Sequence, residues 1–563
     1  MHGEDPSWLA WSRQVADLEL PAFRRALDAC RTDAEQRDLY RARFRWRVRE
    51  FLRFVLPEVF ELPWNGYHRH ALDRPKEHWR DRAARGEVQR NADAAPRGIA
   101  KTTTRKGDVL HDVCYGLEGF VVVIANRQDD AIGWAKTLRG WVEQPTPQLA
   151  WLFGPFTVRG GVEEFSIAAD GGAPVPIATR ALRTPIRGIN YRSQRPTRII
   201  PDDLEDRIRV RNPDLRREER GYLTDDVLKC GPRQGGLKLD LVGTVLHPDS
   251  ALARMIANAE PFRGFKASRW QAVRSWPTRR DLWDRCGRIY CNLAVGDVDA
   301  RRAAARAFYE AHRAAMDEGV EVLDPHALPI WRVYEYVWTD GLSSVLRELQ
   351  NEPIDPSTQL FDSSKFHRCR VERDDRHGDV IVAADGRRIP LHETVRRLWW
   401  DPSNGGDTAA LVVMARDRHG YRYVLDAWVK AVKFEQQIEP FWSLCERWGI
   451  KTARIGATGM YGFESSFRKL RADRKDAGLY HTVQLDFVSE SVNKQDHIVG
   501  TLEVPVTNGW LQFSDALPAA YFAQFDAFSV EASARDAVDD GAPDATSKAY
   551  SDLDTFAGPR MAG

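Results

Sequence analysis

Residues 95–103 read Ala-Pro-Arg-Gly-Ile-Ala-Lys-Thr-Thr, and this stretch decides how the first half of the chain is predicted to fold. It approaches the pattern G-x-x-x-x-G-K-[ST], in which backbone amides at a helix N-terminus surround phosphate oxygens, a lysine adds positive charge and a hydroxyl binds Mg²⁺. Gly98, Lys101 and Thr102 keep their places, whereas Ala95 and Ala100 stand in the two glycine positions. The stretch predicts a phosphate-binding loop that leads into a helix. By itself it also fits a basic turn at the start of a surface helix.

The sequence after the loop alternates between helix and strand patterns. A helix is predicted from Lys101 to about Leu117, and residues 119–125 form an apolar run of strand length. Such a run is typical of a strand that is buried on both faces of a parallel sheet. A helix over 129–143 follows, and further strands are predicted near 196–202 and 237–244. The fold class is therefore predicted to be α/β with a parallel sheet.

Carboxylates follow one of these predicted strands at Asp202, Asp203 and Glu205. In a nucleotide-hydrolysing domain, one carboxylate at this place holds the Mg²⁺ ion and a second polarises the attacking water. We expect Asp202 to bind Mg²⁺, and either Asp203 or Glu205 to activate the water. An acidic helix N-terminus, which the helix dipole favours, is the alternative reading of the same residues. Thr244 ends the next predicted strand and either senses the terminal phosphate or simply begins a turn.

The second half of the chain has a different character. Residues 370–396 are charged, contain Asp-Asp and Asp-Gly turns, and predict a linker and a hairpin. Three strands are predicted next, and Asp401 ends the first of them beside a glycine-rich turn. This start is typical of a ribonuclease-H-like nuclease, which holds two metal ions with carboxylates from different strands. Asp540 and Asp544 are the later partners, although an Asp-Asp pair in a Gly- and Pro-rich setting is usually a turn.

A middle carboxylate of such a nuclease is expected after the strand near 453–456, where this chain has Ala457. Two explanations are open. Either an acid at this position has been replaced by alanine through engineering, or the third carboxylate comes from elsewhere, with Glu464 and Asp407 as the candidates.

Composition limits the other possibilities. The 82 basic and 81 acidic residues give a net charge of +1, so any basic surface must be local. The arginine-rich stretch 207–220 is a candidate DNA contact or a solvated helix face. The seven cysteines are scattered without a C-x-x-C pair, which argues against a disulfide framework and a zinc site. No apolar run approaches the ~18 residues of a membrane span, and no signal-peptide pattern is present. We expect a soluble cytoplasmic protein that does not enter a membrane.

Two segments precede the loop. Residues 1–57 predict amphipathic helices, which either cap the next domain or dock a partner subunit. Residues 58–72 combine aromatic side chains with Asn and Arg, and either recognise adenine or pack into the core.

Taken in order, these pieces resemble the large terminase subunit of tailed bacteriophages. The resemblance covers nearly the whole chain from about Pro63, and its motifs fall in the first half at 96–102, 187–188, 195–205, 243–247 and 351–353. In the second half it rests on Asp401, on 494–498 (Lys-Gln-Asp-His-Ile) and on 539–545.

The resemblance implies a viral genome-packaging motor. Its domains would be a helical N-terminal segment (1–57), a P-loop ATPase domain (58–368), a linker (369–392) and a ribonuclease-H-like nuclease domain (393–563). The ATPase would move double-stranded DNA into a procapsid, and the nuclease would cut concatemeric DNA with Mg²⁺ or Mn²⁺. Implied partners are the portal protein, the small terminase subunit and further copies of this chain in a ring, all in the cytoplasm of the infected host.

The resemblance also assigns residues. ATP would be bound by Arg97, Gly98, Ala100, Lys101, Thr102, Thr103 and Thr244, with Thr102 and Asp202 at the metal. Arg97 would contact the γ-phosphate or move with it. Asp401 and Asp540 would be the catalytic metal ligands of the nuclease, with Asp544 supporting them.

Two other function classes stay open. One is a helicase or translocase ATPase with a fused nuclease, which DNA-stimulated ATP hydrolysis without strand separation would exclude. The other is a structural or scaffold protein with degenerate motifs, given Ala95 and Ala100 in the loop.

Overall fold

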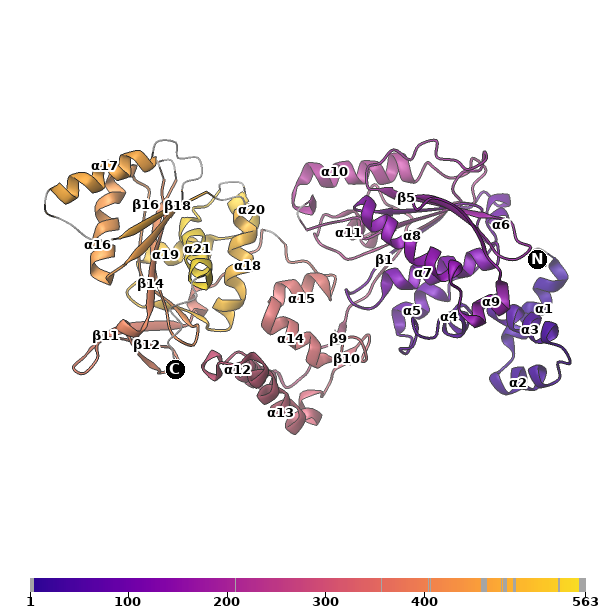
Figure 1. The fold of residues 1–563 in the computed structure, drawn as a ribbon, viewed down its shortest axis with the longest axis horizontal. Helices are drawn as coiled ribbons and strands as arrows, with labels where there is room; N and C mark the ends of the chain where they lie inside the picture. Colours follow the sequence, from indigo (N-terminus) through magenta and orange to yellow (C-terminus); the bar gives the residue numbers. More distant parts are fainter. Residues whose placement is uncertain are drawn as a thin grey trace. The chain divides into compact units, whose positions relative to one another are not determined.

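The computed structural model describes residues 5–207, 209–355, 357–403, 405, 407–456, 463–476, 478, 483–489, 493–534 and 537–555. The chain forms two compact units (Figure 1). The first unit comprises Met1–Pro277, Gly319–Tyr336 and Leu342–Ile354. The second comprises Thr278–Glu318, Val337–Gly341 and Asp355–Gly563.

An eight-stranded sheet forms the centre of the first unit, in the order β3-β4-β5-β2-β6-β7-β1-β8. The strands from β5 to β8 in this order run parallel to their neighbours, and β3 and β4 add an antiparallel edge. The predicted parallel α/β sheet is therefore confirmed. The strand bounds are β1 (Gln89–Ala94), β2 (Val121–Ala125), β3 (Thr157–Gly160), β4 (Glu164–Ala168), β5 (Val175–Ala181), β6 (Arg198–Asp202), β7 (Lys238–Gly243) and β8 (Lys266–Arg269).

Helices cover both faces of this sheet, which explains the continuous apolar run in β2. Val121 and Val123 join a core that includes Leu110 of the helix after the loop. Val122 and Ile124 point to the other face and join a second core. Alternate side chains of one strand thus enter different cores, as expected for a strand buried on both faces.

The helices of the first unit agree with the predicted elements. The helix after the loop is α7 (Lys101–Cys114), and α8 (Gln128–Glu143) packs against β2 and β5 (Figure 1). The other helices are α1 (Pro6–Asp17), α2 (Leu20–Asp28), α3 (Asp33–Phe44), α4 (Val48–Val55), α5 (Gly66–Leu72), α6 (Trp79–Ala84), α9 (Pro147–Phe153), α10 (Pro213–Gly221), α11 (Ala251–Ile256) and α15 (Leu342–Glu348). A 3₁₀ turn (Arg209–Arg211), a π-helical turn (Tyr222–Val227) and the pair β9 (Val273–Ser275) and β10 (Glu321–Val322) complete the unit.

The predicted N-terminal helices are confirmed, and the last of them packs into the first unit. Phe51, Leu52 and Val55 of α4 are fully buried in the same core as Val109 and Leu110 of α7. The first unit therefore begins before residue 58, where the predicted ATPase domain starts.

A nine-stranded sheet forms the centre of the second unit, in the order β13-β12-β11-β19-β16-β15-β14-β17-β18. Strands β14, β15 and β16 pair antiparallel, and β17 and β18 extend the sheet parallel to β14. This arrangement confirms the predicted ribonuclease-H-like fold class. The strand bounds are β11 (Arg368–Asp374), β12 (Gly378–Val382), β13 (Arg388–Pro390), β14 (Val395–Asp401), β15 (Ala409–Arg416), β16 (Arg422–Lys430), β17 (Thr452–Gly456), β18 (Gln484–Val488) and β19 (Leu511–Ser514).

Two helical layers cover this second sheet. Trp400 of β14 packs with helices α16 and α17, and the adjacent Trp399 enters the core formed by α18, α19 and α21. The helix bounds are α12 (Arg280–Tyr290), α13 (Val298–Met316), α16 (Ile438–Trp448), α17 (Phe463–Asp476), α18 (Lys494–Thr507), α19 (Ala519–Ala527), α20 (Val530–Ala534) and α21 (Gly541–Thr555). Helix α14 (Ile330–Asp340) contributes residues to both units. Short 3₁₀ turns lie at Leu293–Val295, Ser363–Lys365, Leu391–Glu393 and Phe434–Gln437.

Two domain limits differ from the sequence prediction. Residues 369–392, expected to be a linker, form β12, β13 and most of β11 in the second sheet. Residues 278–318, expected within the first domain, group with the second unit. The hydroxyl of Tyr421 accepts a hydrogen bond from the Leu293 amide (3.0 Å), and Trp510 Nε1 donates to the Cys291 carbonyl (2.6 Å). These contacts join residues more than a hundred positions apart, which local sequence patterns do not report.

No helix in the described part of the chain has both the length and the apolar character needed to cross a bilayer.

Candidate functional site

The loop at residues 95–100 makes a sharp turn just before α7. Gly98 has φ of +86° and Ala100 has φ of +58°, so the loop uses the left-handed region twice. For alanine this conformation costs about 1–2 kcal/mol, and it therefore needs support from its surroundings. The Ala95 amide donates to the Gly243 carbonyl (3.0 Å), and His68 Nε2 is 2.7 Å from the Ile99 carbonyl oxygen. These contacts hold the loop at the start of α7.

Residues 58–72 act in this structure as the support of the loop. Asn65 caps α5, and its side chain also bonds to Asp324. Tyr67 is fully buried, and burial lowers the pKa of His68, which favours its neutral form. These contacts correspond to packing into the core, which is one of the two roles predicted for this segment.

Strand order brings the predicted residues to one edge of the sheet. Strand β7 lies between β1, which precedes the loop, and β6, which ends at Asp202. Because the three strands are parallel, their carboxyl ends meet at the same edge. Lys101 Nζ lies 2.6 Å from Thr244 Oγ1 and 2.8 Å from Asp203 Oδ1. The Thr102 hydroxyl donates to Asp202 Oδ1 at 3.1 Å.

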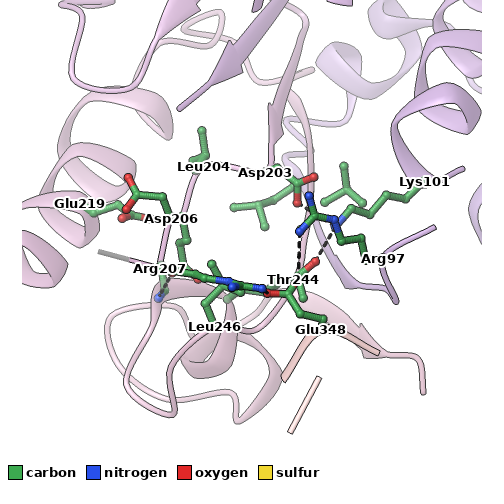
Figure 2. Close-up of a pocket in the computed structure, with 16 residues that line it drawn as sticks. Arg97, Lys101, Asp203, Leu204, Asp206, Arg207, Glu219, Thr244, Leu246 and Glu348 are labelled. Carbon is green, nitrogen blue, oxygen red and sulfur yellow. Dashed lines mark hydrogen bonds and ion pairs between the residues drawn. The ribbon is translucent and has the colours of Figure 1, made fainter. Parts of the chain in front are cut away.

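A cavity of about 340 Å³ opens at this edge (Figure 2). Its lining includes the predicted residues Arg97, Lys101, Asp203, Glu205 and Thr244. Gly98, Ala100, Thr102 and Thr103 do not line it and belong to the loop and the first turn of α7. The structure thus gathers side chains from three separate parts of the sequence around one space.

Burial sets the charge of Asp202. Burial, reinforced by the neighbouring Asp203, raises the pKa of Asp202 to about 7, while Lys101 and Thr102 act in the opposite direction. A buried carboxylate that already touches a hydroxyl suits Mg²⁺, which binds proteins through one or two oxygen ligands and keeps several waters or phosphate oxygens. The donor pair Asp202 and Thr102 therefore fits this metal.

The two candidates for the water-activating acid are in different environments. The Glu205 carboxylate accepts a hydrogen bond from the Ala251 amide (2.7 Å) at the N-terminus of α11, and burial raises its pKa to about 7. Asp203 is half exposed and pairs with Lys101. The Glu205 carboxylate is thus hydrogen-bonded to a helix, whereas Asp203 faces Lys101, the side chain that is predicted to contact the phosphates.

Sequence reasoning missed several acidic and basic residues of this cavity. Asp206, Arg207, Glu219 and Glu348 also line it. Glu348 lies 2.6 Å from Arg207 Nη2 and 3.7 Å from Arg97 Nη1. The motif at 351–353 is the sequence feature next to Glu348. It does not indicate that Glu348 contacts arginines some 140–250 positions upstream.

In the second unit, Asp540 and Asp544 lie at the start of α21 beside Lys494, and Asp401 ends β14. Lys494, the first residue of α18, has its Nζ 2.6 Å from Asp540 Oδ1 and 3.6 Å from Asp544 Oδ2. Burial lowers the pKa of Lys494, but Asp544, Asp540 and Asp401 more than offset this and raise it above that of free lysine. The sequence motif at 494–498 had given Lys494 no role.

Asp407 is a further acid of this region, and the structure describes it, whereas position 457 lies outside the description. Burial raises the pKa of Asp407, and Asp539 and Asp540 contribute to that shift, so Asp407 belongs to the same cluster. Gly456 lies beside Asp401 at the end of β17. Ala457 falls outside the described residues, and Glu464 lies in α17, with its side chain likewise outside the description. Neither explanation for position 457 is therefore tested.

The Lys494 ammonium contacts two of the carboxylates that are predicted to bind metal in the second unit. Among the residues that the structure describes, no group of three or more His, Cys, Asp or Glu side chains is arranged to hold a metal ion. Asp540 and Asp544 supply suitable oxygen donors, but the Lys494 ammonium forms ion pairs with both of them. A metal ion there would have to replace this ammonium.

Comparison with known proteins gave results for the structure only. No protein-family model matches the sequence, and no curated protein matches it significantly. The large terminase from a thermophilic bacteriophage is 8% identical, with 83% of this chain and 91% of that chain covered and a TM-score of 0.39. The HK97 bacteriophage large terminase is 14% identical, with 83% and 89% covered and a TM-score of 0.28.

A third match covers a smaller share of the chain. The nuclease domain of the large terminase subunit gp2 of bacterial virus Sf6 is 15% identical, with 28% of this chain and 87% of that chain covered and a TM-score of 0.20. These three solved structures bear the name of large terminases and come from more than one phage.

Proposed function

We propose that this chain is an ATP-hydrolysing subunit of a viral DNA-packaging motor and carries a metal-dependent nuclease in its second unit. The ATP-hydrolysing part of this proposal rests on one observation. At the edge of a parallel sheet, Lys101 contacts both Thr244 and Asp203, and beside them the Thr102 hydroxyl donates a hydrogen bond to Asp202. The packaging role rests on the order of the motifs along the sequence.

Each residue of the first site has a role in this proposal. The loop amides and Lys101 hold the phosphates of ATP, and Thr102 and Asp202 hold Mg²⁺, which would neutralise charge on the phosphates. Asp203 orients and deprotonates the attacking water, because Glu205 is bound to α11. Arg97 adds positive charge at the terminal phosphate, and Thr244 reports the state of that phosphate to β7.

The second site is proposed to cut DNA with Mg²⁺ or Mn²⁺ held by Asp401, Asp540 and Asp544. Proposed partners are double-stranded DNA, the portal protein, the small terminase subunit and further copies of this chain in a ring. The proposed place of action is the cytoplasm of the infected host.

Two measurements distinguish this proposal from its alternatives. The packaging reading predicts that double-stranded DNA increases ATP turnover and that the protein does not separate the strands of a fluorescently labelled duplex. Strand separation would favour the helicase reading. A protein that neither binds nor hydrolyses ATP would favour the scaffold reading.

DNA binding should depend on phosphate contacts and not on base sequence. Its affinity is therefore expected to fall steeply between 50 and 200 mM salt, by about 10³-fold if roughly six phosphates are contacted. An affinity that was the same at both salt concentrations would contradict this mode of binding.

A further inference from the structure

Glu348, the last residue of α15, sits between two exposed arginines at the cavity. Its side chain is 12% exposed, whereas those of Arg97 and Arg207 are 73% and 51% exposed. Arg207 donates to Glu348 Oε1 through Nη2 (2.6 Å) and Nε (2.9 Å). Arg97 Nη1 lies 3.7 Å from Oε2, and Arg347 Nε lies 3.6 Å from Oε1. Figure 2 shows Arg97 and Arg207 reaching toward this carboxylate from opposite sides.

The backbone of Glu348 is also bound to the phosphate-binding loop. The Arg97 amide donates to the Glu348 carbonyl at 2.9 Å. One residue thus holds both the main chain of the loop and the side chain that the loop presents to the cavity.

The residues after Glu348 fix this position firmly. Gln350 accepts from the Val273 amide and donates to the Val273 carbonyl, both at 3.0 Å. Asn351 accepts from the Val245 amide (2.9 Å) and donates to the Trp270 carbonyl (2.8 Å). Val245 directly follows Thr244, which contacts Lys101. The segment 348–351 therefore touches both the loop and the end of β7.

We propose that Glu348 is a positioning residue that occupies Arg97 and Arg207 in the nucleotide-free protein and competes with the terminal phosphate of ATP for them. Guanidinium groups bind carboxylate and phosphate through the same paired N–H geometry, so one anion substitutes for the other. Without Glu348 the two guanidiniums would lose the anion that they share, whereas Lys101 keeps Asp203 as its own partner. The inference rests on the proposed nucleotide site and adds a selectivity for the triphosphate.

The selectivity follows from the position of Arg97. Its guanidinium lies on the side of the cavity where Lys101 meets Thr244 (Figure 2). In a loop of this pattern the lysine contacts the outer phosphates. Competition by Glu348 is therefore expected to weaken the binding of a triphosphate and to leave that of a diphosphate nearly unchanged.

The test measures nucleotide affinity with the full-length protein. Isothermal titration calorimetry with Mg²⁺ would give the Kd of AMP-PNP and of ADP for wild type, Glu348→Gln and Glu352→Gln. Glu352 is the matched control, because it pairs with Arg269 and Gln271 and does not line the cavity. Loss of one charged competitor is expected to tighten AMP-PNP binding by about tenfold in Glu348→Gln, with ADP changed by less than about twofold. Glu352→Gln should bind both as wild type does.

Three further results decide the proposal. Equal tightening of both nucleotides by Glu348→Gln, or no change in either, would overturn it. When Arg207→Gln is already present, adding Glu348→Gln should increase AMP-PNP affinity by less than Glu348→Gln does in the wild-type protein, because one of the two arginines is gone. An undiminished increase would also overturn the proposal. If Glu348→Gln does not fold, Glu348→Asp gives the same comparison with a carboxylate that reaches less far. Wild-type protein that binds neither nucleotide would instead overturn the proposed function itself.

Discussion

Lys101 and Lys494 occupy comparable positions in the two units, since each places a protonated amine among carboxylates at the start of a helix. Lys101 contacts Asp203 at the loop, and Lys494 contacts Asp540 and Asp544. The loop pattern predicted Lys101 because the residues that define the loop are adjacent in sequence, although its contacts Thr244 and Asp203 lie far along the chain. Lys494 belongs to no such loop pattern, and its partners lie more than 40 residues further along the chain.

Replacing Lys494 tests whether it competes with a metal ion. In Lys494→Ala the carboxylates of Asp540 and Asp544 lose the cation that they share, so Mn²⁺ affinity should rise by about five- to tenfold. Calorimetric titration with Mn²⁺ measures this, and Lys365→Ala, which removes an exposed lysine paired with Asp362, serves as the control. Weaker Mn²⁺ binding in Lys494→Ala would show that the lysine supports the metal site.

Glu219 gives the protein a pH dependence that can be measured without nucleotide. Burial, together with Glu205, raises its pKa from 4.5 to about 8, so the folded state holds a proton that the unfolded state releases. Its contribution to the free energy of unfolding is complete below pH 4.5 and is lost as the pH rises toward 8. Glu219→Gln keeps the neutral form and should exceed wild type in stability by about 1–3 kcal/mol at pH 8, with little difference near pH 4.5.

Urea denaturation at several pH values checks this expectation. The neighbouring Glu218→Gln, which changes an exposed glutamate paired with Arg183, should follow the wild-type curve. A constant difference between Glu219→Gln and wild type at all pH values would contradict the assignment.

At the scale of elements, α7 is anchored to the sheet by a buried network of charges below the loop. Arg198 of β6 forms ion pairs with Asp108 and Asp112 of α7 and with Asp240 of β7. Lys76 pairs with the same two acids of α7, at 2.5 and 2.6 Å. The helix that begins with Lys101 is thus fixed to the two strands that carry Asp202 and Thr244.

Removing the central cation of this network should destabilise the first unit. Arg198→Met leaves three buried carboxylates without their shared partner, which is expected to cost about 3–5 kcal/mol of unfolding free energy. Chemical denaturation without nucleotide measures the loss. The exposed Arg217, which pairs with Asp214, provides the comparison, and Arg217→Ala should change stability by less than about 1 kcal/mol. Equal stability of both variants would mean that the network does not anchor α7.

The elements also show how far sequence reasoning reaches. Strand β2, helix α7 and strand β6 were predicted because their hydrophobic pattern and flanking residues are local. Glu348 was not predicted as part of the cavity, because its contacts with Arg97 and Arg207 depend on how α15 packs. Residues 369–392 were expected to be a linker since charged turns dominate their composition, yet Val380 and Val382 are buried in β12, which pairs with β11 and β13.

At the scale of the whole molecule, the chain passes from the first unit to the second shortly after the segment that touches the proposed nucleotide site. Asn351 contacts Val245, and the second unit resumes at Asp355. The two proposed activities use separate sets of residues, Lys101 and Asp202 in the first unit and Asp401 and Asp540 in the second. They should therefore be separable by mutation.

Separate loss of each activity is the expected behaviour of the full-length protein. Asp401→Asn should abolish plasmid cutting with Mn²⁺, because it removes a metal ligand, and keep ATP turnover within about twofold of wild type. Agarose gel electrophoresis and a phosphate-release assay measure the two activities on the same preparation. Plasmid cutting that persists in Asp401→Asn would place the nuclease site elsewhere.

The central claim is that the cavity at Lys101 hydrolyses ATP, and the turnover of Lys101→Ala tests it most directly. With saturating double-stranded DNA and Mg²⁺, turnover should fall by at least about 10²-fold, because the lysine is lost where charge develops on the phosphates. Lys136→Ala, an exposed lysine on α8, should keep wild-type turnover. A Lys101→Ala protein that melts at the wild-type temperature and hydrolyses ATP at the wild-type rate would contradict the account.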